Sequence, residues 1–254
     1  MNARTLRALA AHSLLAAVVT GAPAEANAQP AAREILNRYA EAIGGAELWK
    51  AREGWHTTGE FSLTAMGLTG SLEIWGGTPD RTVTRVTIPA IGDILRGYDG
   101  TVGWSINPVE GPRLLAGPEL KQLADEAHFG AVIRDPAVIT SAETLEKGTV
   151  DGQECWRVKL VWKSGRETVD CYGIETGLLI GSSGTATTAM GSAEYSTVLG
   201  DYKSFGPYRI PTRITQTALG QQQVITTTTF DVGPVDASKF ALPEPIRALV
   251  KGGG

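Results

Sequence analysis

The sequence predicts a mainly β protein of the α+β class, built on a curved antiparallel sheet with two or more helices covering the concave face. Apolar and polar residues alternate along many short segments, which is typical of antiparallel strands with one solvated face. Glycine-rich turns separate these segments, so successive strands are expected to form a meander. About ten strands are expected, more than a flat sheet usually holds before it curls.

The first 28 residues have the pattern of a secretory signal peptide. Arg4 and Arg7 precede a short apolar run, and Ala26-Asn27-Ala28 matches the small-residue cleavage pattern. The apolar run is too short to span a bilayer. We therefore expect export to the periplasm, with Gln29 as the new N-terminus.

Length and charge set further limits. Removing 28 of the 254 residues leaves 226, a length that suits one domain. We expect this single domain over residues 29–246 and a flexible C-terminal tail over residues 247–254. The net charge changes from −4 to −5, because the removed segment contains two arginines and one glutamate. An acidic chain without a basic run is a poor nucleic-acid binder, so no nucleic-acid partner is expected.

Two amphipathic helices are expected. The first ends at Gly44-Gly45, and its apolar residues recur at helical spacing: Ile35, Leu36, Tyr39, Ala42 and Ile43. Pro118 suits the first turn of the second helix, which ends near Gly130. Its apolar stripe consists of Leu120, Leu123, Ala124 and Ala127. Each helix has one apolar face, so both can cover the concave side of the sheet.

The strand segments place their apolar residues on one face. The alternating apolar positions are Phe61, Leu63, Leu72, Ile74, Trp156, Val158, Leu160 and Trp162. Trp75 has the opposite parity to Ile74, so its side chain is expected to be exposed.

The stretch RGYDGTVGWSINP contains the strongest hairpin signal. Asp-Gly between strand-like segments favours a two-residue turn, with Leu95 opposite Trp104 and both on the apolar face. Asp99 then serves the turn, because aspartate tolerates its positive φ, and does not act as a catalytic acid.

The two cysteines leave two arrangements open. A two-residue turn at Ser164-Gly165 places Val158 opposite Cys171 and points Cys155 to the other face, where no disulfide can form. A three-residue bulged turn puts both cysteines on one face, and export permits the bond. The first register pairs charges and apolar residues consistently, so the unbonded arrangement is favoured.

Five segments cover most of the chain beyond residue 28 and follow one another in a characteristic order: EILNRYAEAIGG, RGYDGTVGWSINPVEGPRLLAGPELKQLADEAHF, GQECWRVKLVWKSGRETVDCYGIETGLLI, LGDYKSFGPYRIPTRITQT and PVDASKFALP. In this order and spacing they resemble a family of exported bacterial proteins, the outer-membrane lipoprotein-sorting proteins with the LolA/LolB-like fold. The resemblance implies a half-open, β-barrel-like sheet with helices at its mouth and an apolar cavity that holds acyl chains. It assigns no individual residue a role.

The sequence contains no recognised catalytic, metal or cofactor motif. His56 and His128 are the histidines beyond residue 28, and they lie too far apart for a short-spaced zinc motif. His128 is placed at the end of the second helix, where it interacts favourably with the helix dipole. Neither a nucleophile elbow nor a phosphate-binding loop is present. We therefore expect neither a cofactor nor an enzyme.

These observations predict a periplasmic carrier that binds lipoprotein acyl chains or another lipid, with an inner- or outer-membrane protein as a possible partner. The predicted cavity lining comes from alternation: Phe61, Leu63, Leu72, Ile74, Leu95, Trp104, Trp156, Val158 and Leu160. Two alternatives stay open. One is an envelope structural or interaction module with a packed core and no ligand, and the other is an enzyme with polar groups inside the concavity. A hollow interior favours the carrier, and a filled interior favours the module.

Overall fold

The structure, a computed structural model, describes residues 29–89, 91–188 and 191–252. The expected signal peptide, residues 1–28, lies outside these residues. Within the described ranges, no helix has the length and apolar character needed to cross a membrane.

Thirteen strands make up the described sheet. In chain order they are β1 (Gly54–Leu63), β2 (Leu68–Gly77), β3 (Arg81–Ile88), β4 (Gly92–Tyr98), β5 (Gly103–Asn107), β6 (Gly111–Leu114), β7 (Ile139–Val150), β8 (Gln153–Trp162), β9 (Glu167–Gly173), β10 (Leu179–Thr188), β11 (Gly191–Phe205), β12 (Tyr208–Ala218) and β13 (Gln221–Val232). The helices are α1 (Ala32–Ala42), α2 (Ala46–Lys50), α3 (Gly117–Ala127) and α4 (Glu244–Gly252), with short 3-10 turns η1 (Thr64–Met66) and η2 (Ala237–Phe240).

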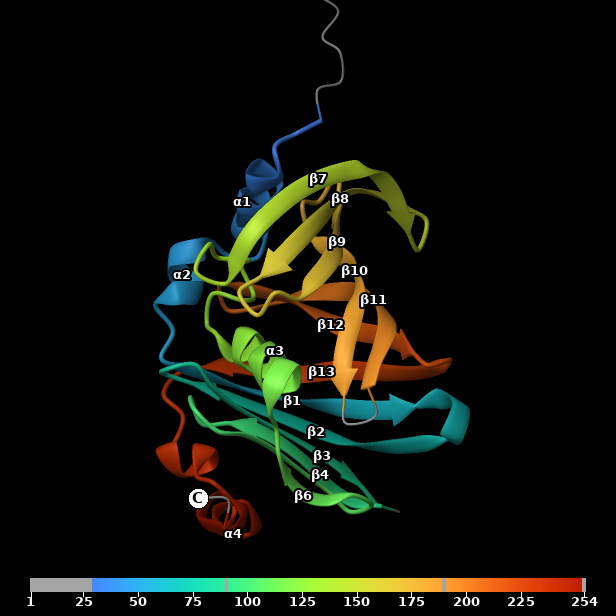
Figure 1. Cartoon of the computed structure of the whole chain (residues 1–254). Helices are drawn as coiled ribbons and strands as arrows, with labels where there is room; N and C mark the ends of the chain where they lie inside the picture. Colours follow the sequence, from blue (N-terminus) through green and yellow to red (C-terminus); the bar gives the residue numbers. More distant parts are fainter. Residues whose placement is uncertain (1–28, 90, 189–190, 253–254) are drawn as a thin grey trace, which may run out of the picture.

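The sheet is an open antiparallel meander. Its strand order is β6-β5-β4-β3-β2-β1-β13-β12-β11-β10-β9-β8-β7, so β6 and β7 form the two edges (Figure 1). The mainly β class and the open, curved sheet are as predicted, with more strands than the sequence indicated. Because β6 and β7 follow each other in the chain, the segment between them must cross from one edge of the sheet to the other. That crossing segment contains α3.

Helix α3 identifies the concave face. It contacts β4 and β5 on one side and β10 on the other, although six strands separate β4 from β10 in the sheet. In a flat sheet β4 and β10 would lie about 34 Å apart, whereas eleven helical residues span about 16 Å. The helix reaches both because the sheet curls around it, and Figure 1 shows α3 between the two halves.

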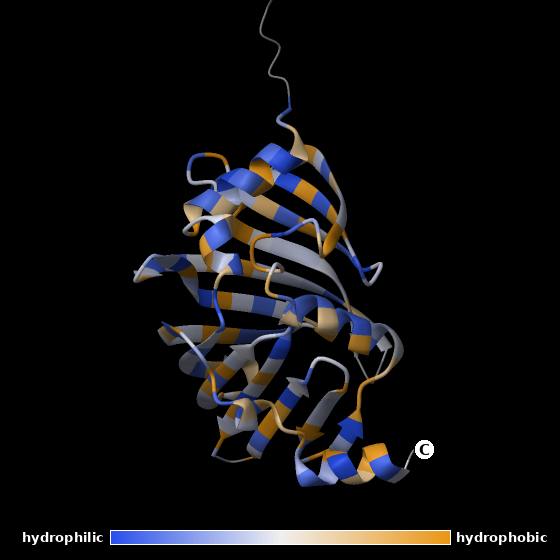
Figure 2. Cartoon of the chain, turned by 90° about the vertical axis from the view of Figure 1, so that its left-hand side faces the viewer, coloured by the Kyte–Doolittle hydropathy of each residue, from blue (hydrophilic) through white to orange (hydrophobic). Residues whose placement is uncertain are grey.

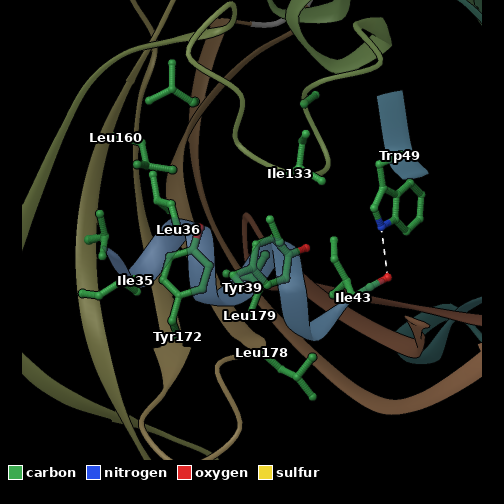
Figure 3. Packing of buried hydrophobic residues seen from close by; sticks show 14 of the residues in the cluster. Ile35, Leu36, Tyr39, Ile43, Trp49, Ile133, Leu160, Tyr172, Leu178 and Leu179 are labelled. Atoms are coloured by element: carbon green, nitrogen blue, oxygen red, sulfur yellow. Dashed lines mark hydrogen bonds between the residues drawn. The ribbon is translucent and has the colours of Figure 1, made fainter. Parts of the chain in front are cut away.

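Helix α1 fills the concave face over strands β8 and β9. Its residues Ile35, Leu36 and Tyr39 are buried in one cluster with side chains from those strands (Figure 3). The rings of Tyr39 and Tyr172 lie 5.3 Å apart. The helix starts where Glu34 accepts a hydrogen bond from the Ala31 amide at 3.3 Å. It ends as the sequence predicts, at Gly44 and Gly45, which both have positive φ.

A second apolar cluster lies on the convex face. It joins Trp75, Val83 and Trp104 of the sheet to Phe240 of η2 and Ile246 of α4. Trp75 is only 5% exposed, so the expectation that it is exposed was wrong. The cover comes from Phe240 and Ile246, which lie within the expected domain, just before the expected tail of residues 247–254. Residues 247–252 of that segment belong to α4, and Figure 1 shows this helix beyond the β6 edge.

The predicted hairpin after β4 is present, but its register differs. Gly97 pairs with Trp104 and Leu95 pairs with Ile106, so the predicted pairing of Leu95 with Trp104 was wrong by two residues. The reason is a longer loop. The Asp99 carboxylate accepts hydrogen bonds from the Thr101 and Val102 amides at 2.9 and 2.7 Å, which fixes four loop residues instead of two.

The Cys155–Cys171 disulfide is formed, with the Cα atoms 5.5 Å apart. The β8–β9 hairpin has the three-residue turn: the Trp162 amide donates to the Arg166 carbonyl at 2.9 Å, and Gly165 has a φ of 85°. Cys171 therefore lies opposite Arg157, and Cys155 is two residues away on the same face. The favoured unbonded arrangement was wrong, because one additional turn residue moves Cys171 to the other face.

We expect the disulfide to contribute about 3 kcal/mol to the free energy of unfolding, since the two cysteines are 16 residues apart. Denaturant unfolding with and without reductant measures this contribution. The double variant Cys155→Ala/Cys171→Ala is the control, and reductant should not change its midpoint. An equal response of both proteins to reductant would show that the bond is not formed in solution.

We expect Ile246→Ala to lower the free energy of unfolding by about 2–4 kcal/mol, because Ile246 is fully buried against the convex cluster. The matched control is Leu249→Ala on the same helix, where the side chain is 39% exposed and the loss should stay below about 0.5 kcal/mol. Thermal unfolding followed by tryptophan fluorescence compares the two. Equal melting temperatures for both variants would mean that α4 does not hold this cluster closed.

Candidate functional site

A row of apolar side chains crosses the concave face beneath α3. Phe61 of β1 pairs with Ile225 of β13, Ile225 pairs with Ile214 of β12, and Ile214 pairs with Leu199 of β11. Directly paired residues point to the same side of a sheet, so these four side chains form a continuous row. All four are half-exposed.

On the other side of β1 the row is displaced by two residues, because Gly70 lies opposite Phe61 and Leu72 lies opposite Gly59. Leu72 of β2 pairs with Val86 of β3, which pairs with Ile94 of β4. Val86 and Ile94 are half-exposed and Leu72 is buried. We call the combined set the apolar ladder: Phe61, Leu72, Val86, Ile94, Leu199, Ile214 and Ile225. It runs across seven adjacent strands on the side of the sheet that faces α3.

The nine residues predicted to line a cavity divide into three groups. Phe61, Leu63, Leu72 and Ile74 lie on the concave face in or beside the apolar ladder. Trp156, Val158 and Leu160 are also concave, but they belong to the cluster under α1, where Val158 and Leu160 have no exposed surface. Leu95 and Trp104 lie on the convex face, in the cluster covered by η2 and α4. The structure therefore does not bring all nine together.

Sequence reasoning missed five members of the apolar ladder: Val86, Ile94, Leu199, Ile214 and Ile225. In β4, β11 and β13 two apolar residues are adjacent, at Ile94-Leu95, Val198-Leu199 and Val224-Ile225, so the alternation is interrupted there. Figure 2 shows apolar and polar bands along the strands. What alternation cannot supply is which of the two faces becomes concave.

Polar contacts hold α3 across the concavity at several points. Near its start, Glu119 accepts two hydrogen bonds from Arg113 at 2.7 and 2.8 Å. These hydrogen bonds lower the pKa of Glu119 below its usual value. Further along, the Asp125 carboxylate accepts from the Ser164 amide at 3.1 Å. The apolar side packs closely, since a Cβ added to Gly103 would lie 2.6 Å from Leu120.

Glu126, near the end of α3, lies between arginines from opposite walls. Arg96 of β4 approaches its Oε2 at 3.5 Å, and Arg166, the residue before β9, approaches its Oε1 at 3.9 Å. Both separations exceed hydrogen-bond length. The Arg166 guanidinium also lies 4.6 Å from the Trp162 ring centre and donates to the Tyr195 hydroxyl at 3.3 Å.

Asp170 is a fully buried carboxylate on the concave face. Its Oδ2 accepts from Arg134 at 2.8 Å and from the Tyr172 hydroxyl at 3.0 Å, and its Oδ1 accepts from Ser182 at 2.7 Å. Burial alone would lower the pKa of Arg134, but the negative charge of Asp170 outweighs this and raises it. With both oxygens occupied and no exposed surface, Asp170 stabilises the crossing segment and is not available to a reactant.

Burial also acts on the tyrosines nearby. It raises the pKa of Tyr39 to about 12, an effect that Arg134 reduces and Asp170 increases. Burial raises the pKa of Tyr172 well above its usual value. These hydroxyls therefore stay protonated at neutral pH and act as hydrogen-bond groups.

Two further hollows are present, and Phe61 of the apolar ladder borders one of them. One of about 470 Å³ adjoins the outer side of α3 and is bordered by Pro79, Asp80, Tyr98, Gly100, Lys121, Ala124, Asp125, His128, Val138, Lys163 and Ser164. Another of about 540 Å³ is bordered by Glu60, Phe61, Ser62, Thr69, Gly70, Ser71, Thr87, Pro89, Val224 and Thr226. Most residues around the second hollow have convex-side parity. More than half of the residues along each border are polar or charged.

The histidines take separate places. His128 caps the end of α3, as its position in the sequence predicted, and its Nδ1 accepts from the Gly130 amide at 2.9 Å. His56 stacks on Trp75 with ring centres 5.1 Å apart. In the part of the chain that the structure describes, no three His, Cys, Asp or Glu side chains form a group that could hold a metal ion.

No family model matches the chain, and no curated protein does. Among solved structures, a LolA superfamily protein from Nitrosomonas europaea has a TM-score of 0.57 at 12% identity, covering 84% of this chain and 98% of its own. A DUF1329 family protein from Desulfovibrio piger has a TM-score of 0.55 at 12% identity, covering 83% and 99%. A domain from Vibrio parahaemolyticus, named as an outer membrane lipoprotein-sorting protein, has a TM-score of 0.51 at 12% identity, covering 86% and 97%.

The chain therefore has the LolA-like fold: an open, curved antiparallel sheet with helices inside its curve. This confirms the resemblance of the five sequence segments as far as the fold is concerned. At 12% identity these comparisons address the fold alone.

We expect Asp170→Asn to lower the free energy of unfolding by about 3–5 kcal/mol, because it leaves the buried Arg134 without its counter-charge. Asp231→Asn removes an exposed carboxylate from β13 and serves as the control, with an expected change within about 0.5 kcal/mol. Urea unfolding at pH 7 measures both. A loss below 1 kcal/mol for Asp170→Asn would contradict a structural role for this pair.

Proposed function

We propose that this protein is a non-enzymatic carrier that binds the acyl chains of a lipid or lipoprotein along the apolar ladder beneath α3. The observation that carries the proposal is the ladder itself. Six of its seven side chains are partly exposed on the concave face, whereas most side chains of the neighbouring cluster under α1 are buried. Partly exposed apolar side chains on adjacent strands offer an extended surface to a hydrocarbon chain.

The energetics favour an elongated apolar ligand. Each methylene moved out of water contributes roughly 0.8 kcal/mol, so a chain lying along several ladder residues gains enough to offset its lost freedom. α3 lies over the same concavity and can shield the far side of the chain. No bond is made or broken in this process, in keeping with the absence of a recognised catalytic motif from the sequence.

We further propose that the carrier works in the periplasm, after export directed by residues 1–28, and exchanges its ligand with an inner- or outer-membrane partner. The LolA-like fold supports this setting. One protein with that fold is named for lipoprotein sorting in the outer membrane. The alternative is an interaction module with a packed core and no ligand. The region under α1 is packed in this way, but the apolar ladder is not.

Replacing Ile225 with Asn tests the ladder. This substitution puts a polar amide in the middle of the row, and we expect it to weaken binding of a fluorescent fatty acid about tenfold or more, the effect of losing contact with one large aliphatic side chain. Val224→Asn is the matched control. Val224 is the preceding residue on β13, it is also half-exposed, and it pairs with Ser62 and Thr215 on the convex face.

Fluorescence titration of the purified proteins gives the three dissociation constants. Retention of wild-type affinity by Ile225→Asn, or an equal loss in Val224→Asn, would remove the concave face as the binding surface. If the wild-type protein neither binds the fatty acid nor carries lipid in native mass spectrometry, the packed module becomes the better account.

A further inference from the structure

We propose that Arg96 and Arg166 form a binding site for the anionic headgroup of an acyl ligand, and that Glu126 of α3 occupies this site when no ligand is bound. The inference rests on the proposed function and adds the chemical class of the ligand. It concerns the three side chains that meet where the end of α3 faces both walls of the curled sheet.

The first argument is position. Arg96 pairs with Thr84 across β3 and β4, on the same face as Val86 and Ile94 of the apolar ladder. Arg166 lies on the opposite wall, over the ring of Trp162. A ligand whose chain lies along the ladder can therefore place its headgroup near a guanidinium group on either side of α3.

The second argument is incomplete pairing. Glu126 stays 3.5 Å from Arg96 and 3.9 Å from Arg166, and the Nε of Arg166 is buried without a hydrogen-bond partner. The Arg166 side chain is only 12% exposed. A buried guanidinium with an unused donor is costly, and here its five N–H groups face one Tyr195 hydroxyl at 3.3 Å and one carboxylate at 3.9 Å.

The third argument is charge. Two guanidinium groups face one carboxylate, which leaves a net charge of about +1 in this group of three. Of the other acids nearby, Asp170 pairs with Arg134 at 2.8 Å, and the buried carboxylate of Asp125 accepts a hydrogen bond from the Ser164 amide at 3.1 Å. A phosphate has more acceptor oxygens than a carboxylate, so it can bind both arginines through several hydrogen bonds at once.

The fourth argument concerns how Glu126 is held. Its Oε1 also accepts a hydrogen bond from Gln122 at 2.9 Å, one helical turn earlier on α3. Because Glu126 is 37% exposed, this carboxylate can turn toward solvent and keep its hydration when a headgroup takes its place. It thus acts as an internal substitute for the ligand's negative charge.

Isothermal titration calorimetry tests the proposal with two probes that each have a twelve-carbon chain, used below their critical micelle concentrations. Dodecyl phosphate carries the anionic headgroup, and 1-dodecanoylglycerol is neutral. We expect wild-type protein to bind dodecyl phosphate about tenfold more tightly, the factor that one additional hydrogen bond between charged groups supports. Inorganic phosphate alone should bind far more weakly than dodecyl phosphate, because it lacks the chain.

Two variants should change this preference in opposite directions. Arg166→Gln should weaken dodecyl phosphate binding about tenfold and leave 1-dodecanoylglycerol binding within twofold. Glu126→Gln should strengthen dodecyl phosphate binding several-fold, since it removes the competing charge. Arg213→Gln removes an exposed arginine from the convex side of β12 and should change neither. Arg96→Gln, at a half-exposed position, repeats the Arg166 test if Arg166→Gln fails to fold.

The outcomes separate this inference from the proposed function. Equal wild-type affinity for the two probes would overturn the headgroup site and leave the acyl carrier standing. A loss of dodecyl phosphate binding in both Glu126→Gln and Arg166→Gln would also overturn it, because it would mean that the three residues only stabilise α3. If inorganic phosphate binds as tightly as dodecyl phosphate, the site is not a lipid headgroup site. Binding of neither probe would refute the carrier, and this inference with it.

Discussion

The crossing of the chain from one edge of the sheet to the other is the constraint on which the rest of the structure depends. Strands β6 and β7 are consecutive in sequence and lie at opposite edges of a 13-stranded sheet. The connection passes through the concave side, and α3 is short, so the sheet must curl until both walls touch it. The fold therefore encloses a space because a short segment joins two distant edges.

The concave space has two regions, which differ in the side chains that cover the sheet. Over β8 and β9, helix α1 supplies large apolar side chains that close the interior to solvent, as a packed core requires (Figure 3). Across β11 to β4, the described ladder residues other than the buried Leu72 keep part of their surface exposed, although Leu199 also packs against the cluster under α1. The same alternating pattern thus serves stability in one region and leaves a surface for a ligand in the other.

The charged groups on the concave side also differ between a fully paired set and an incompletely paired set. Asp170 and Arg134 are satisfied by each other and by Tyr172 and Ser182, and they fix the segment that follows α3. Arg96, Glu126 and Arg166 are close but imperfectly paired, at the boundary between the packed region and the ladder. A fully hydrogen-bonded pair such as Asp170 and Arg134 stabilises the structure. Arg166, which has an unused donor, can still form a hydrogen bond with another partner.

The sequence by itself determined the class, the helices α1 and α3, the meander and the alternation in strands such as β1 and β8, because these depend on short-range periodicity and turn chemistry. Turn length depends on local residues, but the sequence did not predict it correctly at two hairpins. One additional turn residue placed Cys171 on the other face of the sheet, and the longer Asp99 loop changed the residue paired with Leu95. Only the tertiary structure decided which face became concave. It placed Trp104 and Leu95 under α4 and brought Arg96, Glu126 and Arg166 together, since the curl joins residues that no local pattern connects.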